Sequence, residues 1–299
     1  MTLRLFCCLC YALLASVLHG RPGGTFCGTY PDNWRETVDL HERFERRRAA
    51  SPRPARAAAA AQRKSSDIGN IAVLENDDSL FGRRNPFNLD AFQVTFARSR
   101  SGYAYSTAAG GFDQSAVNAG TPVTGIGDDD SRRIELPFAF PFYGASYREL
   151  WLNSDGNLTF GDGDNASSAR SLGRMSAGPP RISPLFTDLD PSIPGATIRV
   201  AASAAAFTVT WFRVPEFADF GNGRPQTFQV KLFPDGRISF AWSGISIDDG
   251  IVGISPGNTN ARPLFAAYRQ NPAGSHDTMI AERFGDAQAL DLVAAARRF

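Results

Sequence analysis

Residues Gln226–Ser243 have the sequence QTFQVKLFPDGRISFAWS, in which large apolar residues alternate with other residues on both sides of Pro234-Asp235-Gly236. That period of two is typical of half-buried strands and predicts a β-hairpin. A two-residue Asp-Gly turn would place the two apolar rows on opposite faces, whereas a three-residue Pro-Asp-Gly loop with a left-handed glycine places them on one face. We therefore predict the second register, with the cross-strand pairs Leu232–Ile238, Val230–Phe240 and Phe228–Trp242.

The same turn chemistry recurs in YRELWLNSDGNLTFG, residues Tyr147–Gly161. A three-residue Ser154-Asp155-Gly156 loop pairs Leu152 with Leu158 and again gives one apolar face. Two hairpins of this kind predict an antiparallel, all-β core. The residues expected to form the two turns are Asp155, Gly156, Pro234, Asp235 and Gly236.

Short apolar segments separated by turn residues continue through residues 128–260, which is the pattern of a β-sandwich. We predict an antiparallel β-sandwich built from hairpins in that range. Residues 67–127 are predicted to form a small β-rich region, in which Phe92, Val94 and Phe96 alternate along one strand. Residues 261–299 form a C-terminal extension with a helical tail, ALDLVAAARRF, and its abrupt end raises the alternative that the chain is a fragment.

The N-terminal segment has the features of a secretory signal peptide, which we place at residues 1–20. Arg4 precedes an apolar run from Leu5 to Leu18, and that run is too short to span a bilayer comfortably. No other segment of the sequence is a candidate membrane span. These features predict a secreted, extracellular protein.

Two further segments precede the β-rich part. In residues 21–48, an apolar stripe with helical spacing predicts a short amphipathic helix; it consists of Trp34, Val38, His41 and Phe44. Residues 49–66 are rich in arginine, alanine and proline, and we predict that they form a solvated linker.

Removal of the signal peptide leaves Cys27 as the one cysteine of the mature chain, so we expect no internal disulfide. Cys27 can form an intermolecular disulfide or stay an unpaired thiol, and the spacing does not decide between these two states.

The charges of the chain nearly balance, with 31 basic and 30 acidic residues and a net charge of +1. This balance gives no electrostatic case for nucleic acid as a partner. Only Lys64 and Lys231 among the basic residues are lysines. We attribute this arginine bias, together with the alanine-rich runs, to a GC-rich genome, and we predict a bacterial source.

Several motifs in a fixed order resemble those of the nidogen-like extracellular domain, which also occurs in plexin-domain-containing proteins. They are FPFYGASYRELWLNSDGNLTFG, ISPLFTDLDPS, VTW, QTFQVKLFPDGRISFAW and GIVGISPGN, and they cover residues 128–260. The resemblance implies an extracellular β-sandwich that acts in adhesion or matrix interaction and has no agreed catalytic residues. The chain departs from animal members in lacking flanking cysteine-rich modules, which puts the partner in doubt.

A second resemblance concerns the segments FCGTYPDNW and DIGNIAVLE near the N-terminus. They are similar to segments of large secreted bacterial proteins in which such a module precedes further domains, sometimes a peptidase. This resemblance implies an alternative function, as an accessory region of a longer secreted protein.

The sequence contains none of the catalytic motifs that we searched for. Beyond the signal peptide there are two histidines, His41 and His276, with no HExxH pair, no phosphate-binding GxxxxGK[ST] loop and no dinucleotide fingerprint. Ser275-His276-Asp277 contains the residue types of a hydrolase triad, but sequence neighbours point in different directions, so we expect a loop. We predict that the chain is not an enzyme.

Acidic residues in the predicted loops offer the oxygen ligands that Ca²⁺ prefers. The candidate calcium ligands are Asp128, Asp129, Asp130, Asp188 and Asp190. None of them fits the EF-hand pattern, and aspartate is also a common turn and capping residue, so a purely structural role is the alternative. No other cofactor is expected.

We therefore predict a secreted, non-catalytic β-sandwich module that mediates extracellular binding or adhesion, with a protein or a glycan as its partner. The alternative is that the chain is the N-terminal accessory region of a longer secreted hydrolase, for example a metallopeptidase, whose catalytic domain lies beyond residue 299.

Overall fold

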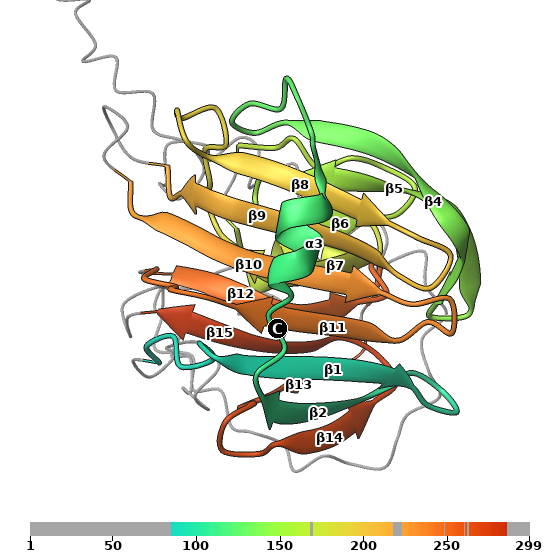
Figure 1. The fold of residues 1–299 in the computed structure, drawn as a ribbon. Helices are drawn as coiled ribbons and strands as arrows, with labels where there is room; N and C mark the ends of the chain where they lie inside the picture. Colours follow the sequence, from blue (N-terminus) through green and yellow to red (C-terminus); the bar gives the residue numbers. More distant parts are fainter. Residues whose placement is uncertain are drawn as a thin grey trace, which may run out of the picture.

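The computed structural model describes residues 85–285 except 168–169, 218–222, 248, 260 and 262. Within this range two β-sheets pack face to face (Figure 1). Two short helices lie outside the sheets. The first sheet has the strand order β14 (Ala273–His276), β2 (Tyr103–Ala109), β1 (Phe92–Arg98), β11 (Ile238–Trp242), β10 (Pro225–Leu232), β9 (Phe207–Pro215), β8 (Thr197–Ala202) and β3 (Thr121–Pro122).

The second sheet has the strand order β13 (Leu264–Phe265), β15 (Ile280–Gly285), β12 (Asp249–Ser255), β7 (Arg181–Phe186), β6 (Asn157–Thr159), β5 (Ala145–Asn153) and β4 (Ser131–Phe142). The paired strands are antiparallel except β13 and β15, which are parallel. The predicted all-β, antiparallel architecture is therefore confirmed for the described residues, except that the β13–β15 pair is parallel.

The hairpin formed by β10 and β11 has the predicted register. Leu232 pairs with Ile238, Val230 with Phe240 and Phe228 with Trp242. Gly236 is left-handed with φ +86° and donates its N–H to the carbonyl of Phe233 at 2.9 Å, which closes the three-residue loop. All six paired side chains are at most 1 % exposed, so the single apolar face predicted from the alternation is the face that the core buries.

The hairpin formed by β5 and β6 is also confirmed. Leu152 pairs with Leu158, and Gly156 has φ +67° in the turn between the strands. A Cβ atom on Gly156 would lie 2.0 Å from the carbonyl oxygen of Leu185 in β7. This position therefore needs glycine for its backbone conformation and also for the close approach of a neighbouring strand.

The core lies between the two sheets and is rich in aromatic side chains. The rings of Trp211 and Phe228 stack with centroids 5.0 Å apart. The indole N–H of Trp242 in the first sheet donates to the carbonyl of Pro184 in the second sheet at 2.8 Å. This hydrogen bond satisfies the buried N–H and crosses from one sheet to the other, so it links the two sheets.

The sheets extend beyond residues 128–260. Strand β1 lies between β2 and β11, with Val94 opposite Phe240 and Phe96 opposite Ile238, so residues before 128 complete the central part of the first sheet. Strands β14 and β15, which come from the predicted C-terminal extension, also belong to the two sheets. The apolar rows of β1 and β11 face the same core, which explains why these distant segments pair.

Several predictions fall on residues outside the described part of the chain. These are the signal peptide, the amphipathic helix, the linker, Cys27 and the helical tail. Among the described residues, the helices are too short and too polar to cross a membrane.

Two short helices that the sequence patterns did not reveal cover the outer faces of the sheets. Helix α3 (Gln114–Ala119) is capped by Asp113 and contacts β8 and β9 of the first sheet (Figure 1). The carboxylate of Asp113 also pairs with Lys231 on β10 at 2.5 Å. Helix α4 (Leu172–Ala177) is capped by Ser171 and contacts β12 of the second sheet.

Candidate functional site

The structure brings together three of the five predicted calcium ligands. Asp128 and Asp129 precede β4, Asp188 follows β7, and one carboxylate oxygen from each lies within 4.8 Å of the others. The other two have local partners instead: Asp130 accepts from the N–H of Ser131 at 2.7 Å, and Asp190 accepts from the N–H of Ser192 at 2.9 Å. Hydrogen bonds between a carboxylate and a nearby backbone N–H are typical of aspartates that stabilise turns, which is the structural role given above as the alternative to calcium binding.

A buried arginine supplies the positive charge among these carboxylates. The Nη2 atom of Arg170 lies 2.5 Å from Asp129 Oδ1, 2.8 Å from Asp155 Oδ2 and 3.0 Å from Asp188 Oδ1. Arg170 is 4 % exposed. Asp155, predicted only as a turn residue, is thus also an ion-pair partner, and no sequence signal marked Arg170 because its segment has no periodic pattern.

A second ion network lies close to the first and includes residues of α4 and of β7 in the second sheet. Asp164 accepts 2.5 Å hydrogen bonds from both Arg174 in α4 and Arg181 in β7, and Arg181 also donates to Asn157 on β6. Although burial alone would raise it, the pKa of Asp164 is held well below its usual range by the guanidinium groups of Arg181 and Arg174.

These two networks hold the segment that carries α4 onto the outer face of the second sheet. All three arginines are under 5 % exposed, and the guanidinium of Arg181 also lies over the ring of Phe186 at 4.6 Å. Such buried charges are tolerated because each has an opposite charge and further hydrogen bonds. We therefore interpret the networks as structural elements of the domain.

A thermal melt tests whether Asp128, Asp129 and Asp188 bind calcium. We expect the melting midpoint of the full chain to be the same in calcium and in EDTA, because the Arg170 guanidinium already neutralises Asp129 and Asp188, the carboxylates that an ion would need. A midpoint that calcium raises and EDTA lowers would show that an ion competes successfully with the guanidinium.

Asp188 is expected to make the stability depend on pH. Burial raises the pKa of Asp188 from 3.8 to about 7, with Arg170 opposing and the nearby carboxylate of Asp155 adding to the shift. The folded state then binds a proton more tightly than the unfolded state, so this group stabilises the fold as the pH falls from 7 toward 4. The slope is at most about 1.4 kcal/mol per pH unit.

Urea unfolding of the full chain at pH 8, 6.5 and 5 checks this prediction. Asp188→Asn stays neutral at every pH, so the variant should lack the part of the pH dependence that Asp188 contributes. Other titrating groups remain in both proteins, and the comparison is therefore the difference between the two pH profiles. Parallel profiles would contradict the assignment.

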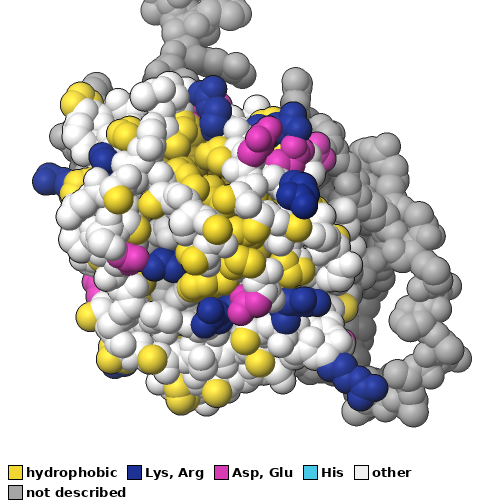
Figure 2. Space-filling model, turned by 45° about the vertical axis from the view of Figure 1, so that its right-hand side comes forward, with side chains coloured by type: hydrophobic (Ala, Val, Ile, Leu, Met, Phe, Trp, Pro, Cys, Tyr) yellow, Lys and Arg dark blue, Asp and Glu magenta, His cyan; other side chains and the backbone are white. Residues whose placement is uncertain are grey.

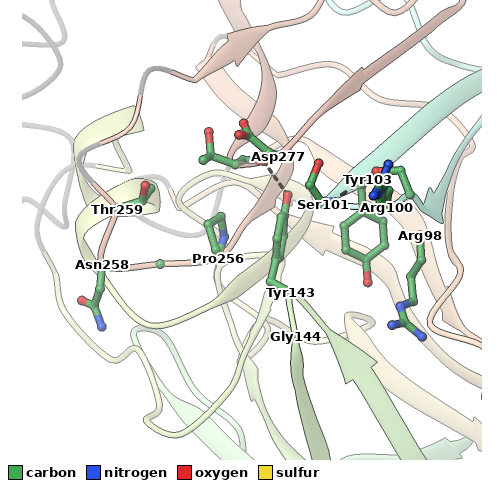
Figure 3. Close-up of a pocket in the computed structure, with 14 residues that line it drawn as sticks. Arg98, Arg100, Ser101, Tyr103, Tyr143, Gly144, Pro256, Asn258, Thr259 and Asp277 are labelled. Carbon is green, nitrogen blue, oxygen red and sulfur yellow. Dashed lines mark hydrogen bonds between the residues drawn. The ribbon is translucent and has the colours of Figure 1, made fainter. Parts of the chain in front are cut away.

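An open cleft lies where four connections between strands meet. It has a volume of about 530 Å³. Figure 3 shows its lining, which comes from the turn between β1 and β2 (residues 98–103), the turn between β4 and β5 (Tyr143-Gly144), the loop after β12 (residues 256–259) and residues Asp277-Thr278 after β14.

Tyr143 stands in the middle of this cleft (Figure 3). It has φ +44° and the following Gly144 has φ +83°, so the two form a left-handed hairpin turn, where asparagine is the usual first residue. A tyrosine in this conformation is strained by about 1 kcal/mol. Its hydroxyl donates to the carbonyl of Thr278 at 2.6 Å, and its ring lies 5.0 Å from that of Tyr103. Burial raises the pKa of Tyr143 well above its usual range.

The charged groups of the cleft are Arg98, Arg100 and Asp277. Both arginines are exposed, and within the described part of the chain neither makes an ion pair. The side chain of Asp277 is 64 % exposed and lies 3.7 Å from the imidazole of His276. Sequence reasoning named Asp277 only as part of the Ser275-His276-Asp277 segment, and it singled out neither arginine, because an exposed arginine in a turn carries no pattern.

The segment Ser275-His276-Asp277 is not the loop that we predicted. Ser275 and His276 end strand β14 and pair with Ala104 and Tyr103 of β2. Consecutive strand residues point to opposite faces, so the hydroxyl of Ser275 and the imidazole of His276 are directed apart. Ser275 and His276 therefore lack the geometry of a triad, because they lie on opposite faces of a strand and not because they lie in a loop.

The family model described as NIDO related matches residues 102–282, which is more than half of the chain. The chain belongs to the NIDO-related family. No solved structure matches the chain. The NIDO-related range contains the resemblance that the motifs indicated at residues 128–260 and extends it to strands β2 and β14.

Most of the cleft falls inside the NIDO-related range. Tyr103, Tyr143, Asn258 and Asp277 belong to it, as do both ion networks, whereas Arg98 and Arg100 precede it. Most of the cleft is thus part of the family domain, and its two arginines come from the segment just before it.

Proposed function

We propose that this chain is a non-catalytic extracellular module that binds another molecule through the cleft around Tyr143. The observation that carries the proposal is the cleft itself. It is open, mostly polar and built from four connections that are far apart in the sequence. Binding residues often lie on loops that a rigid scaffold positions, and this sandwich provides such a scaffold.

The chemistry of the described residues favours binding over catalysis. The buried aspartates are ion-paired with Arg170, Arg174 and Arg181 in the two networks. In the cleft, Asp277 is largely exposed, and the nearby Ser275 points away from His276. Acyl transfer needs a nucleophile, a base and an orienting group within hydrogen-bond reach of one another, and the cleft residues do not offer that arrangement.

Two sequence features support an extracellular location, namely the predicted signal peptide and the resemblance to nidogen-like extracellular domains. The NIDO-related match lends no support to the alternative that the chain precedes a hydrolase domain. We therefore retain binding or adhesion outside the cell as the proposed role.

One face of the molecule carries an apolar patch that is compatible with binding. Figure 2 shows apolar side chains gathered in the middle of one face, with basic and acidic side chains around them. An apolar centre with a polar rim is the usual arrangement of a protein interface. This face is secondary to the cleft in our proposal because the structure does not indicate its occupant.

Binding of the labelled full chain to an array of extracellular proteins and glycans tests the proposed function. We expect saturable binding to at least one class of molecule, and we expect Ser101→Trp to abolish it. Ser101 is exposed in the turn after β1 and lines the cleft, so a tryptophan there fills the cleft without disturbing the core.

The same preparation should not hydrolyse peptide or glycoside substrates. Turnover that is lost in His276→Ala or Asp277→Asn would contradict the non-catalytic proposal. Array binding that Ser101→Trp leaves unchanged would contradict the assignment of the cleft.

A further inference from the structure

The cleft has a basic side and a side rich in amide and hydroxyl groups. Figure 3 shows Arg98 and Arg100 on one side of Tyr143, and Asn258 and Thr259 on the other. The stem of Arg98 passes close to Gly236 of the β10–β11 turn, where a Cβ would meet its Cδ atom at 2.5 Å. Two guanidinium groups so close in sequence offer planar sets of donors that match carboxylate or sulfate groups.

The rest of the lining favours a ligand with many hydroxyl groups. Pro256 and two tyrosines are the large apolar contributors, and a pocket for an aliphatic or aromatic anchor of a peptide would need more apolar surface. The other side chains that line the cleft carry hydroxyl, amide or carboxylate groups; they are Ser99, Ser101, Asn258, Thr259, Asp277 and Thr278.

Asp277 distinguishes between two kinds of acidic ligand. Its exposed carboxylate would repel the carboxylates of an acidic peptide such as poly-L-glutamate, whose side chains offer no hydroxyl groups in return. The same carboxylate accepts hydrogen bonds from hydroxyl groups, which a sugar presents at almost every carbon. A sugar that also carries an acidic group would satisfy Asp277 and the two arginines together.

The hydroxyl-rich side of the cleft is held rigidly. Among the described residues, five non-glycine residues have positive φ, and two of them, Tyr143 and Asn258, line the cleft. The N–H of Asn258 donates to the carbonyl of Gly178 at 3.0 Å, and the N–H of Thr259 donates to that of Ser176 at 3.1 Å. Strained residues fixed in this way are found at binding sites, where a preformed shape lowers the entropic cost of binding.

We infer that the cleft binds an acidic glycan. Its carboxylate or sulfate groups contact Arg98 and Arg100, and its hydroxyl groups contact Asp277 and the residues beyond Tyr143. The inference rests on the proposed function, because it names the ligand class of the same cleft.

Binding of the full chain to four soluble polymers tests the inference. The probes are polygalacturonate, dextran sulfate, neutral dextran and poly-L-glutamate. We expect polygalacturonate or dextran sulfate to bind, and which of them binds more tightly distinguishes a carboxylate from a sulfate ligand. The double variant Arg98→Gln/Arg100→Gln should bind that polymer at least about tenfold more weakly, because each arginine supplies charged hydrogen bonds.

A charge-matched double variant, Arg133→Gln/Arg213→Gln, is the control for non-specific attraction. Both of its arginines are exposed and neither lines the cleft. The inference is overturned if the two double variants lose affinity equally, if poly-L-glutamate binds as tightly as the acidic polysaccharides, or if no polymer binds. The proposed function survives these outcomes as long as the array detects another ligand whose binding Ser101→Trp abolishes.

Discussion

We expect replacement of Arg170 with methionine to lower the free energy of unfolding by about 3–5 kcal/mol. The guanidinium contacts Asp129, Asp155 and Asp188, and its removal leaves these carboxylates close together without a counter-charge. Asp155 is 1 % exposed and Asp188 is 6 % exposed, so water cannot replace the lost partner. Urea denaturation of the full chain, monitored by tryptophan fluorescence, measures the change.

The matched control is Arg133→Met. Arg133 pairs with Glu149 on the surface, where both side chains are more than 40 % exposed. Solvent screens that pair, so the control should lose much less stability than Arg170→Met. If the two variants were equally stable, Arg170 would not be the counter-charge of the buried carboxylates.

We expect replacement of Gly156 with alanine to destabilise the fold by about 2–5 kcal/mol, because two costs combine. The residue has φ +67°, a conformation that an L-residue with a Cβ rarely adopts. In addition, the new methyl group would lie 2.0 Å from the carbonyl oxygen of Leu185 and 2.9 Å from the ring of Phe228. Either the β5–β6 turn or strand β7 must therefore move.

Gly195→Ala separates the two costs. Gly195 has φ +91°, but a Cβ atom there would meet no other atom within 4 Å. The control carries the backbone strain alone and should lose about 1 kcal/mol. Equal losses in both alanine variants, measured by the same urea denaturation, would mean that the approach of β7 to Gly156 has no energetic consequence.

The candidate site shows why a sequence reveals some functional groups and hides others. Aspartates in turns stand out because they lie in loops beside predicted strands, and three of the predicted five do come together. Arginine gives no such signal. Arg98 is exposed beside the cleft and Arg170 is buried among carboxylates, yet both are preceded and followed by polar or small residues in the sequence. Only the packing of distant segments decides which arginine meets solvent.

The sequence by itself determined the two hairpins, the all-β class and the family. Alternation of apolar residues and the choice of turn residues act over a few neighbouring positions, so Leu232 opposite Ile238 and Leu152 opposite Leu158 follow from local geometry. Motif order along the chain carried the resemblance to nidogen-like domains, which the NIDO-related match bears out.

Only the tertiary structure decided the rest. Strand β1 lies between β2 and β11, the arginines of residues 170–181 pair with aspartates on several loops, and four separate connections converge on Tyr143. Each of these arrangements depends on contacts between residues far apart in the chain. Those contacts form because the two sheets bury their apolar faces together, and a local pattern does not specify which distant partner each segment meets.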